Sequence, residues 1–391
     1  MSFLFTFKKI LSIIILLVIV LSICIAPILA KAEEAKNEIG MEFECESAVL
    51  MEATTGTVLY QKNPDKALPP ASVTKIMTLL LVMQEINDGK LKYDDKVTTS
   101  AYAASMGGSQ VFLKEGEIMS VEDMLKSVVI SSANDAAVAL AEHICGSEEA
   151  FVKRMNTEAQ KLGMTNTNFE NTNGLDDTAT RHVTSAIDIA IMSRELIKYD
   201  DILKYSSTWM DTIRNGEFTL TNTNRLVRFY QGATGLKTGS TSKAKFCISA
   251  TAKRGNMHLI CVVMGAPSSD VRNSIATKLL NWGFANYELL DISSKQLSPI
   301  KVLGGTESFC QIEACSFSTV LEKGSTEKIE STYVLPNTVS APIAIGDEIG
   351  YVEYKVGSKV VGKAPIVSTV NIERIDYWAL FIKILSKFVI K

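Results

Sequence analysis

The most informative segment of this chain is Pro69-Pro70-Ala71-Ser72-Val73-Thr74-Lys75, which places a hydroxyl and an amine three residues apart. An apolar run, Ile76 to Met83, follows it and predicts a helix that begins at Ser72, because the two prolines block any extension upstream. Side chains three residues apart on a helix are neighbours, so the Lys75 amine can reach the Ser72 hydroxyl. An amine that burial leaves neutral can take a proton from serine, so the pair predicts a nucleophile and its base.

The Ser-x-x-Lys spacing is weak evidence when it stands alone, because it recurs in this chain. It also occurs at Ser240/Lys243, Ser242/Lys245 and Ser325/Lys328. Two further motifs strengthen the first copy: Ser132-Ala133-Asn134 lies downstream, and Lys237-Thr238-Gly239 lies further on in a predicted strand. Three motifs of this kind in this order are typical of enzymes that form an acyl intermediate on serine.

Several other segments extend the similarity to one known family. They are Ala48 to Tyr60, Asn171 to Leu175, His182 to Ala186, and Val263 to Ala266 ahead of Arg272. Together with the three motifs, they resemble the low-molecular-weight penicillin-binding proteins, which are serine-type D-alanyl-D-alanine carboxypeptidases. The resemblance is close over the first two thirds of the chain and looser beyond it.

The resemblance implies a reaction and a role for each residue of the first two motifs. Ser72 would attack the carbonyl of the penultimate D-Ala of a peptidoglycan stem peptide while Lys75 takes the hydroxyl proton, and the terminal D-Ala would leave. Ser132 would relay a proton to the leaving amine. Asn134 would bind both the substrate amide and Lys75. The backbone N–H groups of Ser72 and Ser240 would stabilise the oxyanion.

The third motif and Arg272 imply recognition of a free carboxylate. Lys237 would raise the positive potential of the cleft, and Gly239 completes the motif. Thr238 and Arg272 would contact the carboxylate directly, since a guanidinium matches that group. β-Lactam antibiotics would act as covalent inhibitors on Ser72. The resemblance implies no cofactor.

Each assignment has a simpler alternative. Asn134 could cap the helix that begins at Asp135, and we expect it both to cap and to bind. Lys237 and Arg272 could be solvated surface charges. The three histidines are far apart in sequence and predict neither a catalytic triad nor a metal site, so we interpret them as structural: His143, His182 and His258.

Two positions depart from the family pattern. Ala133 stands where relatives usually carry glycine, and Lys245 stands where glycine often follows the Lys-Thr-Gly strand. Neither change removes a reacting group. The first changes local backbone freedom and the second adds a charge near the active-site strand, so they bear on substrate preference rather than on the type of reaction.

The N-terminus predicts export. Lys8-Lys9 precede an apolar run, Ile10 to Ala26, and small residues near Ala32 form a cleavage site, so residues 1–32 are expected to be a signal peptide. A retained membrane anchor is the alternative. Lipidation at Cys24 is disfavoured because the large Ile23 precedes it. The mature protein would lie on the extracytoplasmic face of the cell membrane.

The cysteines do not decide the architecture. Removal of Cys24 leaves an even number, which permits disulfides in an exported protein without requiring them: Cys45, Cys145, Cys247, Cys261, Cys310 and Cys315. Cys247 and Cys261 lie in apolar strand-like runs, so buried thiols are at least as good an interpretation.

Composition and pattern predict a two-domain α/β (α+β) protein. The 391 residues are 47% hydrophobic with a formal net charge of -3, which is typical of a globular protein and disfavours nucleic-acid binding. Residues 33–287 are expected to form a serine β-lactamase/transpeptidase-like catalytic domain, an antiparallel sheet with a helical lobe. Residues 288–370 alternate in short runs and predict a small all-β domain.

The final segment, residues 371–391, predicts an amphipathic helix. Trp378, Phe381 and Leu385 recur at helical spacing, and another face carries basic residues at Lys383, Lys387 and Lys391. This pattern favours a helix that lies in a membrane interface. A helix that packs on its own domain is the alternative.

Three functions remain open from the sequence. A D-alanyl-D-alanine carboxypeptidase is the first, a class A-like β-lactamase the second, and a non-catalytic penicillin-binding scaffold the third. The β-lactamase is disfavoured because no Glu-x-x-Leu-Asn segment lies between Asn134 and Lys237. The scaffold is disfavoured because every reacting group is present.

Overall fold

A computed structural model describes residues 42–176, 179–324 and 328–389 of the chain. The predicted signal peptide and Cys24 lie outside these residues. The described chain separates into two compact units, which we treat one at a time. The first holds the residues up to 254 together with 258–283, and the second holds 255–257 and the residues from 284 onward.

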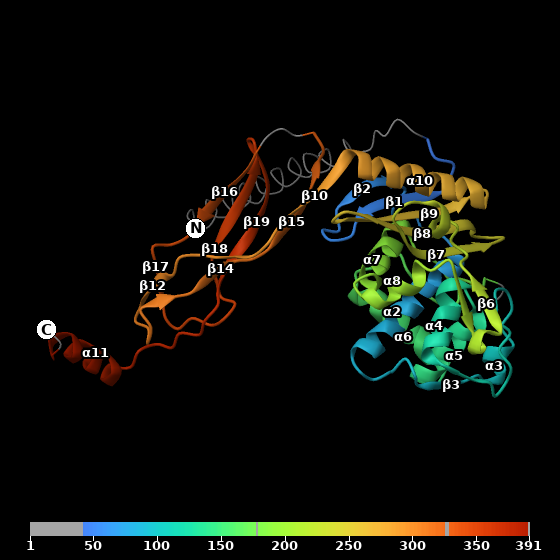
Figure 1. Cartoon of the computed structure of the whole chain (residues 1–391), viewed down its shortest axis with the longest axis horizontal. Helices are drawn as coiled ribbons and strands as arrows, with labels where there is room; N and C mark the ends of the chain where they lie inside the picture. The colour runs from blue at the N-terminus through green and yellow to red at the C-terminus, as the bar shows by residue number, and fades with distance from the viewer. Residues whose placement is uncertain (1–41, 177–178, 325–327, 390–391) are drawn as a thin grey trace, which may run out of the picture. The chain divides into compact units, whose positions relative to one another are not determined.

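The first unit is built on a five-stranded sheet with the strand order β2-β1-β9-β8-β7 (Figure 1). Its strands are β1 Ser47–Glu52, β2 Val58–Lys62, β7 Ala233–Thr241, β8 Lys245–Arg254 and β9 Met257–Ala266. Strand β1 pairs antiparallel with β2 and β9, and β7 pairs antiparallel with β8. All ten residues of the central β9 are buried, because both faces of the sheet are covered.

Helix α10, Ser269–Asn286, covers one face of this sheet, and the other helices form a lobe against the opposite face (Figure 1). A Cβ on Gly283 of α10 would lie 2.8 Å from Leu259 and 2.9 Å from Leu50, so glycine allows close packing there. The lobe contains the 3-10 helix η2 Ala71–Thr74 and the helices α2 Lys75–Asn87, α3 Ala101–Ala104, α4 Val121–Ile130, α5 Asn134–Cys145, α6 Glu148–Lys161, α7 Ala186–Leu196, α8 Asp200–Ser206 and α9 Leu226–Phe229. The expected antiparallel sheet with a helical lobe is confirmed.

Two short antiparallel pairs complete the first unit. They are β3 Lys96–Thr98 with β4 Ile118–Ser120, and β5 Met210–Ile213 with β6 Phe218–Thr221. The 3-10 helix η3, Arg214–Gly216, joins β5 to β6. The second pair leads to the catalytic motifs. Thr223, two residues after β6, accepts a hydrogen bond from Thr238 in the strand with the Lys-Thr-Gly sequence.

Local sequence signals explain where most of the helices begin. Sequence capping signals predict helices that begin after Ser120, Ser147 and Ser185, and the hydroxyl of each accepts a backbone N–H three residues on, which confirms all three. The helix predicted to begin at Ser72 differs in detail. The chain first makes the 3-10 turn η2 and becomes α-helical only at Lys75.

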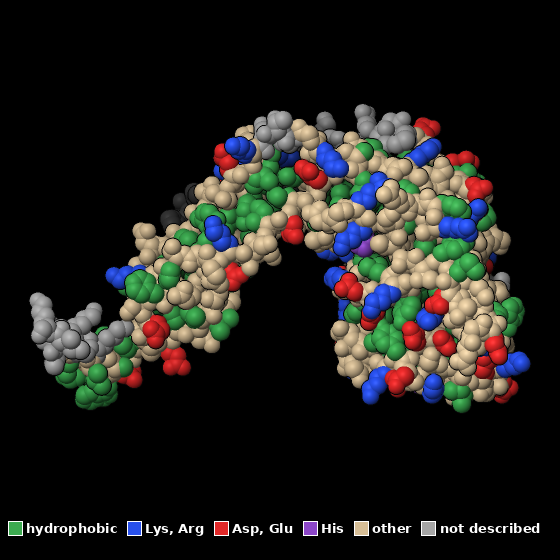
Figure 2. All heavy atoms as spheres, in the orientation of Figure 1, with side chains coloured by type: hydrophobic (Ala, Val, Ile, Leu, Met, Phe, Trp, Pro, Cys, Tyr) green, Lys and Arg blue, Asp and Glu red, His purple; other side chains and the backbone are tan. Residues whose placement is uncertain are grey.

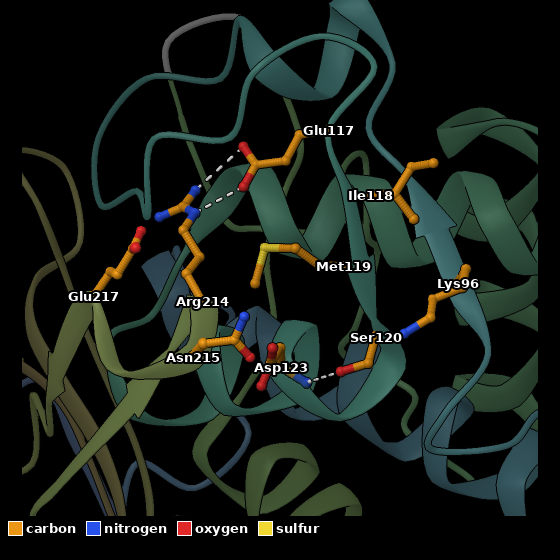
Figure 3. Close-up of a pocket in the computed structure, with 9 residues that line it drawn as sticks. All are labelled: Lys96, Glu117, Ile118, Met119, Ser120, Asp123, Arg214, Asn215 and Glu217. Atoms are coloured by element: carbon orange, nitrogen blue, oxygen red, sulfur yellow. Dashed lines mark hydrogen bonds and ion pairs between the residues drawn. The ribbon is translucent and has the colours of Figure 1, made fainter.

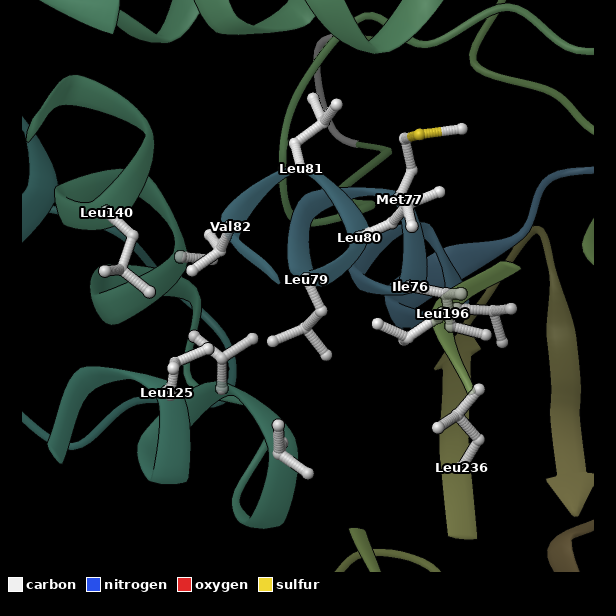
Figure 4. Packing of buried hydrophobic residues seen from close by; sticks show 14 of the residues in the cluster. Ile76, Met77, Leu79, Leu80, Leu81, Val82, Leu125, Leu140, Leu196 and Leu236 are labelled. Carbon is white, nitrogen blue, oxygen red and sulfur yellow. The ribbon is translucent and has the colours of Figure 1, made fainter. Parts of the chain in front are cut away.

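Helix α2 lies at the centre of the hydrophobic core. Figure 4 shows its apolar side chains, Ile76 to Val82, surrounded by Leu125, Leu140, Leu196 and Leu236 from four other elements. A helix that is apolar on all sides is stable only when it is buried, and α2 meets that condition. The central helix therefore carries Lys75 at its first position into a fully buried environment.

The second unit is made of strands up to residue 368. A five-stranded sheet has the order β11-β14-β19-β18-β16, a three-stranded one the order β13-β12-β17, and β10 pairs with β15. The strands are β10 Tyr287–Ile292, β11 Lys295–Gln296, β12 Ile300–Leu303, β13 Phe309–Cys310, β14 Ile312–Ala314, β15 Phe317–Glu322, β16 Ile329–Val334, β17 Thr338–Ser340, β18 Glu348–Val356 and β19 Lys359–Ser368. The predicted small all-β domain is confirmed.

The cysteines of the described chain are free thiols. Cys247, Cys261 and Cys310 are buried, and Cys45, Cys145 and Cys315 are partly exposed. Burial raises the pKa of the Cys247 thiol to about 11, which makes it inert as a nucleophile.

Helix α11, Tyr377–Val389, forms the last described element. Its large apolar side chains are exposed, with Trp378 at 70% and Phe381 at 47%, and Figure 2 shows hydrophobic side chains gathered on this helix. No helix among the described residues is both long and apolar enough to cross a membrane. The predicted basic stripe of Lys383, Lys387 and Lys391 lies outside the side chains that the structure describes.

Candidate active site

Ser72 and Lys75 face each other where η2 passes into α2. The Lys75 Nζ lies 3.0 Å from the Ser72 Oγ, within hydrogen-bond distance. Ser72 is partly exposed while Lys75 is fully buried, so the hydroxyl is accessible and the amine is dry. The close pair that the three-residue spacing predicts is therefore present.

Burial and a second cation act on the Lys75 amine. Desolvation, together with the positive charge of Lys237, holds the pKa of Lys75 well below its usual value, and the carboxylate of Asp135 only partly opposes this. Desolvation and the charge of Lys237 both disfavour the charged form of the amine. The lowered pKa favours the neutral form of the Lys75 amine.

The contacts of Lys75 allow its neutral form to act on Ser72. Besides Ser72, its Nζ lies 2.6 Å from Oδ1 of Asn134 and 2.8 Å from the carbonyl oxygen of Asn173, and both of these atoms can only accept. A neutral amine has two N–H bonds and one lone pair. When the two N–H groups donate to the two oxygens, the lone pair is left for the Ser72 hydroxyl, which can donate to it.

Asn134 links the nucleophile to the loop before β4. Its Nδ2 donates to the carbonyl oxygen of Gly107 at 2.7 Å, and its backbone N–H donates to the carbonyl oxygen of Ser109 at 2.7 Å. The prediction that Asn134 also caps helix α5 is wrong. Asn134 is the first residue of that helix and Ala133 takes the capping position, so the amide is free to reach Lys75.

Ser132 lies at a strained turn between α4 and α5. Its φ is 62°, a left-handed conformation that is uncommon for residues other than glycine, and its side chain is buried. Ala133, by contrast, is extended at φ -60° and ψ 121°, so alanine fits without strain where relatives carry glycine. The turn that carries the second motif is thus strained at the serine and not at the alanine.

A buried histidine supports the turn that carries Ser72. Nε2 of His182 lies 2.7 Å from the Thr74 hydroxyl, which donates to the carbonyl oxygen of Ala71 at 2.8 Å. Nδ1 of His182 accepts the N–H of Glu170, which leaves the proton on Nε2. Burial lowers the pKa of His182 to about 4, so the ring is neutral. Apart from the match of His182 to the family pattern, no sequence signal predicts this link.

Gly174 allows this turn to form. Ala71 adopts a left-handed φ of 50°, and a Cβ on Gly174 would lie 1.8 Å from the carbonyl oxygen of Ala71. Only glycine fits there. The segment that presents the Asn173 carbonyl to Lys75 therefore packs directly against the residue before the nucleophile.

Strand β7 forms the facing wall. A Cβ on Gly239 would lie 2.8 Å from both the Ser72 nitrogen and the Pro70 oxygen, so this glycine brings β7 against the nucleophile turn. Lys237 is buried, and Thr238 donates to the Thr223 hydroxyl at 2.8 Å. Ser240 is exposed at the open side of the strand.

Two buried cations lie on this wall without an acidic partner. Arg272 donates to the carbonyl oxygen of Cys247 and to the amide oxygen of Asn273. Burial, with the charge of Arg272, lowers the pKa of Lys237 to about 7, and burial lowers that of Arg272 to about 10. Among the described residues neither cation forms an ion pair with a carboxylate. This wall is therefore electrostatically prepared for an anion.

The second departure from the family pattern has a visible backbone consequence. Lys245 adopts a left-handed φ of 55° at the start of β8, which explains why glycine is common there. Its exposed amine lies 3.6 Å from Glu46. The added charge is therefore partly neutralised at the surface.

A separate polar pocket of the first unit holds none of these residues. Figure 3 shows it between β4, α4 and the turn after β5, with Arg214 facing Glu117. Among the described residues, no group of three or more His, Cys, Asp or Glu side chains could hold a metal ion. Lys75 contacts both Ser72 and Asn134, and the charge of Lys237 acts on its amine. This arrangement is suited to acyl transfer, and it defines a serine hydrolase with lysine beside the nucleophile.

Comparisons with known proteins agree with this class. The family model described as D-alanyl-D-alanine carboxypeptidase matches residues 31–268, and the C-terminal domain of penicillin-binding protein 5 matches residues 289–374. The chain is 41% identical to D-alanyl-D-alanine carboxypeptidase DacF of Bacillus subtilis over 93% of this chain and 94% of that protein. The chain therefore belongs to the D-alanyl-D-alanine carboxypeptidase family of serine peptidases.

Solved structures give the same result. Penicillin-binding protein 5 from Haemophilus influenzae superposes with a TM-score of 0.77 at 33% identity, covering 85% of this chain and 99% of that one. Penicillin-binding protein D2 from Listeria monocytogenes in its ampicillin-bound form superposes at 0.55 with 32% identity, covering 62% and 99%. These likenesses favour neither of the two other functions considered from the sequence, a β-lactamase or a scaffold.

Proposed function

We propose that this protein removes the terminal D-Ala from peptidoglycan stem peptides through an acyl-enzyme on Ser72. The Ser72 Oγ forms a bond to the carbonyl carbon of the penultimate D-Ala, and its proton passes to Lys75. The C–N bond to the terminal D-Ala then breaks, and the leaving amine takes a proton by way of Ser132. Water hydrolyses the resulting ester and releases the shortened peptide and free Ser72.

The observation that carries this proposal is the environment of Lys75. Its amine is buried, touches the nucleophile, and has two acceptors that use both N–H bonds of the neutral form. General-base catalysis needs the neutral amine at the pH of the reaction, and the lowered pKa of Lys75 favours that form. Lysine thus takes the part that histidine plays in other serine hydrolases.

The opposite wall would bind the substrate. The carboxylate of the terminal D-Ala would lie against Lys237, Thr238 and Arg272, where two buried cations have no acidic partner. The oxyanion would accept from the backbone N–H groups of Ser72 and Ser240, which Gly239 brings close together. Asn134 would hold the substrate amide as well as Lys75.

Penicillins would acylate the same serine. A β-lactam carries a strained amide and a carboxylate, so it fits a site built for an acyl group beside an anion pocket. The ampicillin-bound relative from Listeria monocytogenes supports this expectation.

We further propose that the protein works on the outer face of the cell membrane, held there by α11. The exposed aromatic and aliphatic side chains of this helix are the support for that role, together with the basic residues of the sequence. Residues 1–32 would direct export, and residues 288–370 would form a domain that links residues 33–287 to this helix.

One assay tests the reaction itself. Purified protein is incubated with a stem peptide that ends in D-Ala-D-Ala, and released D-Ala is measured for the native chain, Ser72→Ala and Lys75→Arg. We expect no release from Ser72→Ala. Lys75→Arg keeps the charge but offers no neutral amine, so its rate should fall by about 10² to 10⁴. Full activity in either variant would overturn the assignment.

A further inference from the structure

An exposed pair of aromatic rings lies on the surface of the catalytic unit. Phe112 is 67% exposed, and its ring centroid lies 6.5 Å from that of the partly exposed Phe218. Between them is an open hollow of about 600 Å³, whose edge also carries Lys114 and Arg214. The aromatic platform, as we call Phe112 and Phe218 together, has no role in the reaction described above.

The backbone holds Phe112 in an unfavourable conformation. Its φ is 58°, which is a genuine outlier for a bulky residue. The carboxylate of Asp135 accepts the N–H groups on both sides, from Val111 at 3.2 Å and from Leu113 at 3.0 Å. Leu113 and Val111 are buried, whereas Phe112 points outward. A strained backbone conformation that hydrogen bonds hold in place, and that exposes an apolar ring, indicates a functional surface.

The other half of the platform is also held in place. Arg214 donates through Nε to Glu117 at 2.7 Å and through Nη1 to the carbonyl oxygen of Val111 at 2.9 Å, and its guanidinium lies 5.2 Å from the Phe218 ring centroid. Figure 3 shows Arg214 and Glu117 joined in this way. The hairpin that carries Phe218 is therefore fastened to the loop that carries Phe112.

The same loop reaches the catalytic residues. The carbonyl oxygen of Ser109 accepts the backbone N–H of Asn134, whose side chain contacts Lys75. Ser109 and Phe112 are three positions apart in the chain, so their Cα atoms lie at most about 11 Å apart. The platform is thus on the Asn134 side of the cleft and within reach of a substrate bound there.

We propose that the aromatic platform binds the glycan strand of peptidoglycan. This inference rests on the proposed function, because the stem peptide is joined to a glycan through its N-terminus. Four residues lie between the scissile bond and that junction, so the glycan of a bound substrate is carried only a short peptide's length, on the order of 14 Å, from Ser72. Pyranose rings present flat C–H faces that pack on aromatic rings, and their hydroxyl and acetamido oxygens can accept from Lys114.

The test compares one pentapeptide in two forms, free and linked to its N-acetylated disaccharide. Released D-Ala gives kcat/KM for both substrates with the native chain and with Phe112→Gly, Phe112→Tyr and Phe218→Ala. Phe112→Gly removes the ring while suiting the left-handed backbone, so loss of loop structure does not confuse the result. We expect Phe112→Gly and Phe218→Ala to lower kcat/KM on the linked substrate about fivefold to tenfold more than on the free one, and Phe112→Tyr to retain the native ratio.

Phe309→Ala is the matched control, since Phe309 is 59% exposed in the second unit. It should leave the ratio of the two kcat/KM values unchanged. Equal losses on both substrates would mean that Phe112 only supports Asn134, and unchanged kcat/KM values on both substrates would mean that the platform meets another protein or a second copy. Either result overturns the proposal. Failure of the native chain to release D-Ala from the free peptide would instead refute the proposed function.

Discussion

Replacing Asn134 by aspartate tests whether Lys75 acts as a neutral base. The variant has nearly the same shape and places a carboxylate where the amide oxygen lies, 2.6 Å from the Lys75 Nζ. Coulomb's law gives about 6 kcal/mol for two unit charges at this distance and an effective dielectric constant of about 20. If relaxation and the nearby Lys237 remove half, about 3 kcal/mol remains in favour of the protonated amine, which lowers the ratio of neutral to protonated Lys75 roughly 10²-fold.

The assay is the rate of acylation by a chromogenic penicillin as a function of pH. An added negative charge raises the pKa of Lys75, so the acid limb of the Asn134→Asp profile should move to higher pH, and the rate should recover in alkaline buffer. Asn134→Ala is the control, because it loses the contacts to Lys75 and Gly107 without adding charge. A profile that drops equally at every pH, as in the alanine variant, would refute a neutral lysine base.

Three further outcomes are expected. Gly239→Ala should slow acylation at least tenfold, because the added Cβ would press on the turn that carries Ser72. Gly107→Ala is the control and should acylate at the native rate, because its added Cβ meets open space. Equal acylation rates for the two variants would contradict this. Burial lowers the pKa of His182 and His258 to about 4, so both rings stay neutral in the folded protein at a pH where the unfolded chain takes up protons. The free energy of unfolding should therefore fall by up to about 3 kcal/mol per histidine as the pH drops from about 6.5 to 4. Urea titrations should show a smaller fall for His182→Gln than for the native protein, and equal falls would contradict this. Truncation after Asn371, in protein without the signal segment, should abolish co-sedimentation with anionic vesicles and leave peptide turnover intact; equal sedimentation of both forms would show that α11 is not an anchor.

Local spacing in the sequence was enough to predict the reacting pair. Ser72 and Lys75 are one helical turn apart, so their contact follows from helix geometry even though the turn begins as a 3-10 helix. The strands of the sheet and the serine caps were likewise predictable, because alternation and capping are short-range signals. The resemblance supplied what spacing does not contain, namely that Ser132 to Asn134 and Lys237 to Gly239 belong to the same site.

Long-range contacts could not be predicted in this way. The carbonyl of Asn173 reaches Lys75 across 98 positions of the chain, and His182 reaches Thr74 across 108. A backbone carbonyl leaves no residue-type signal, and an isolated histidine is normally structural. The capping role predicted for Asn134 failed because capping statistics take no account of a buried amine that competes for the same side chain.

Mass spectrometry of the penicillin adduct identifies the nucleophile directly. The native protein is incubated with benzylpenicillin, quenched and digested, and the modified peptide is identified. One penicilloyl group should be found per chain, on Ser72 within the segment from Pro70 to Lys75. Intact Ser72→Ala protein treated in the same way should show no adduct. Modification of another serine in the native chain, or a stoichiometric adduct on Ser72→Ala, would contradict the account.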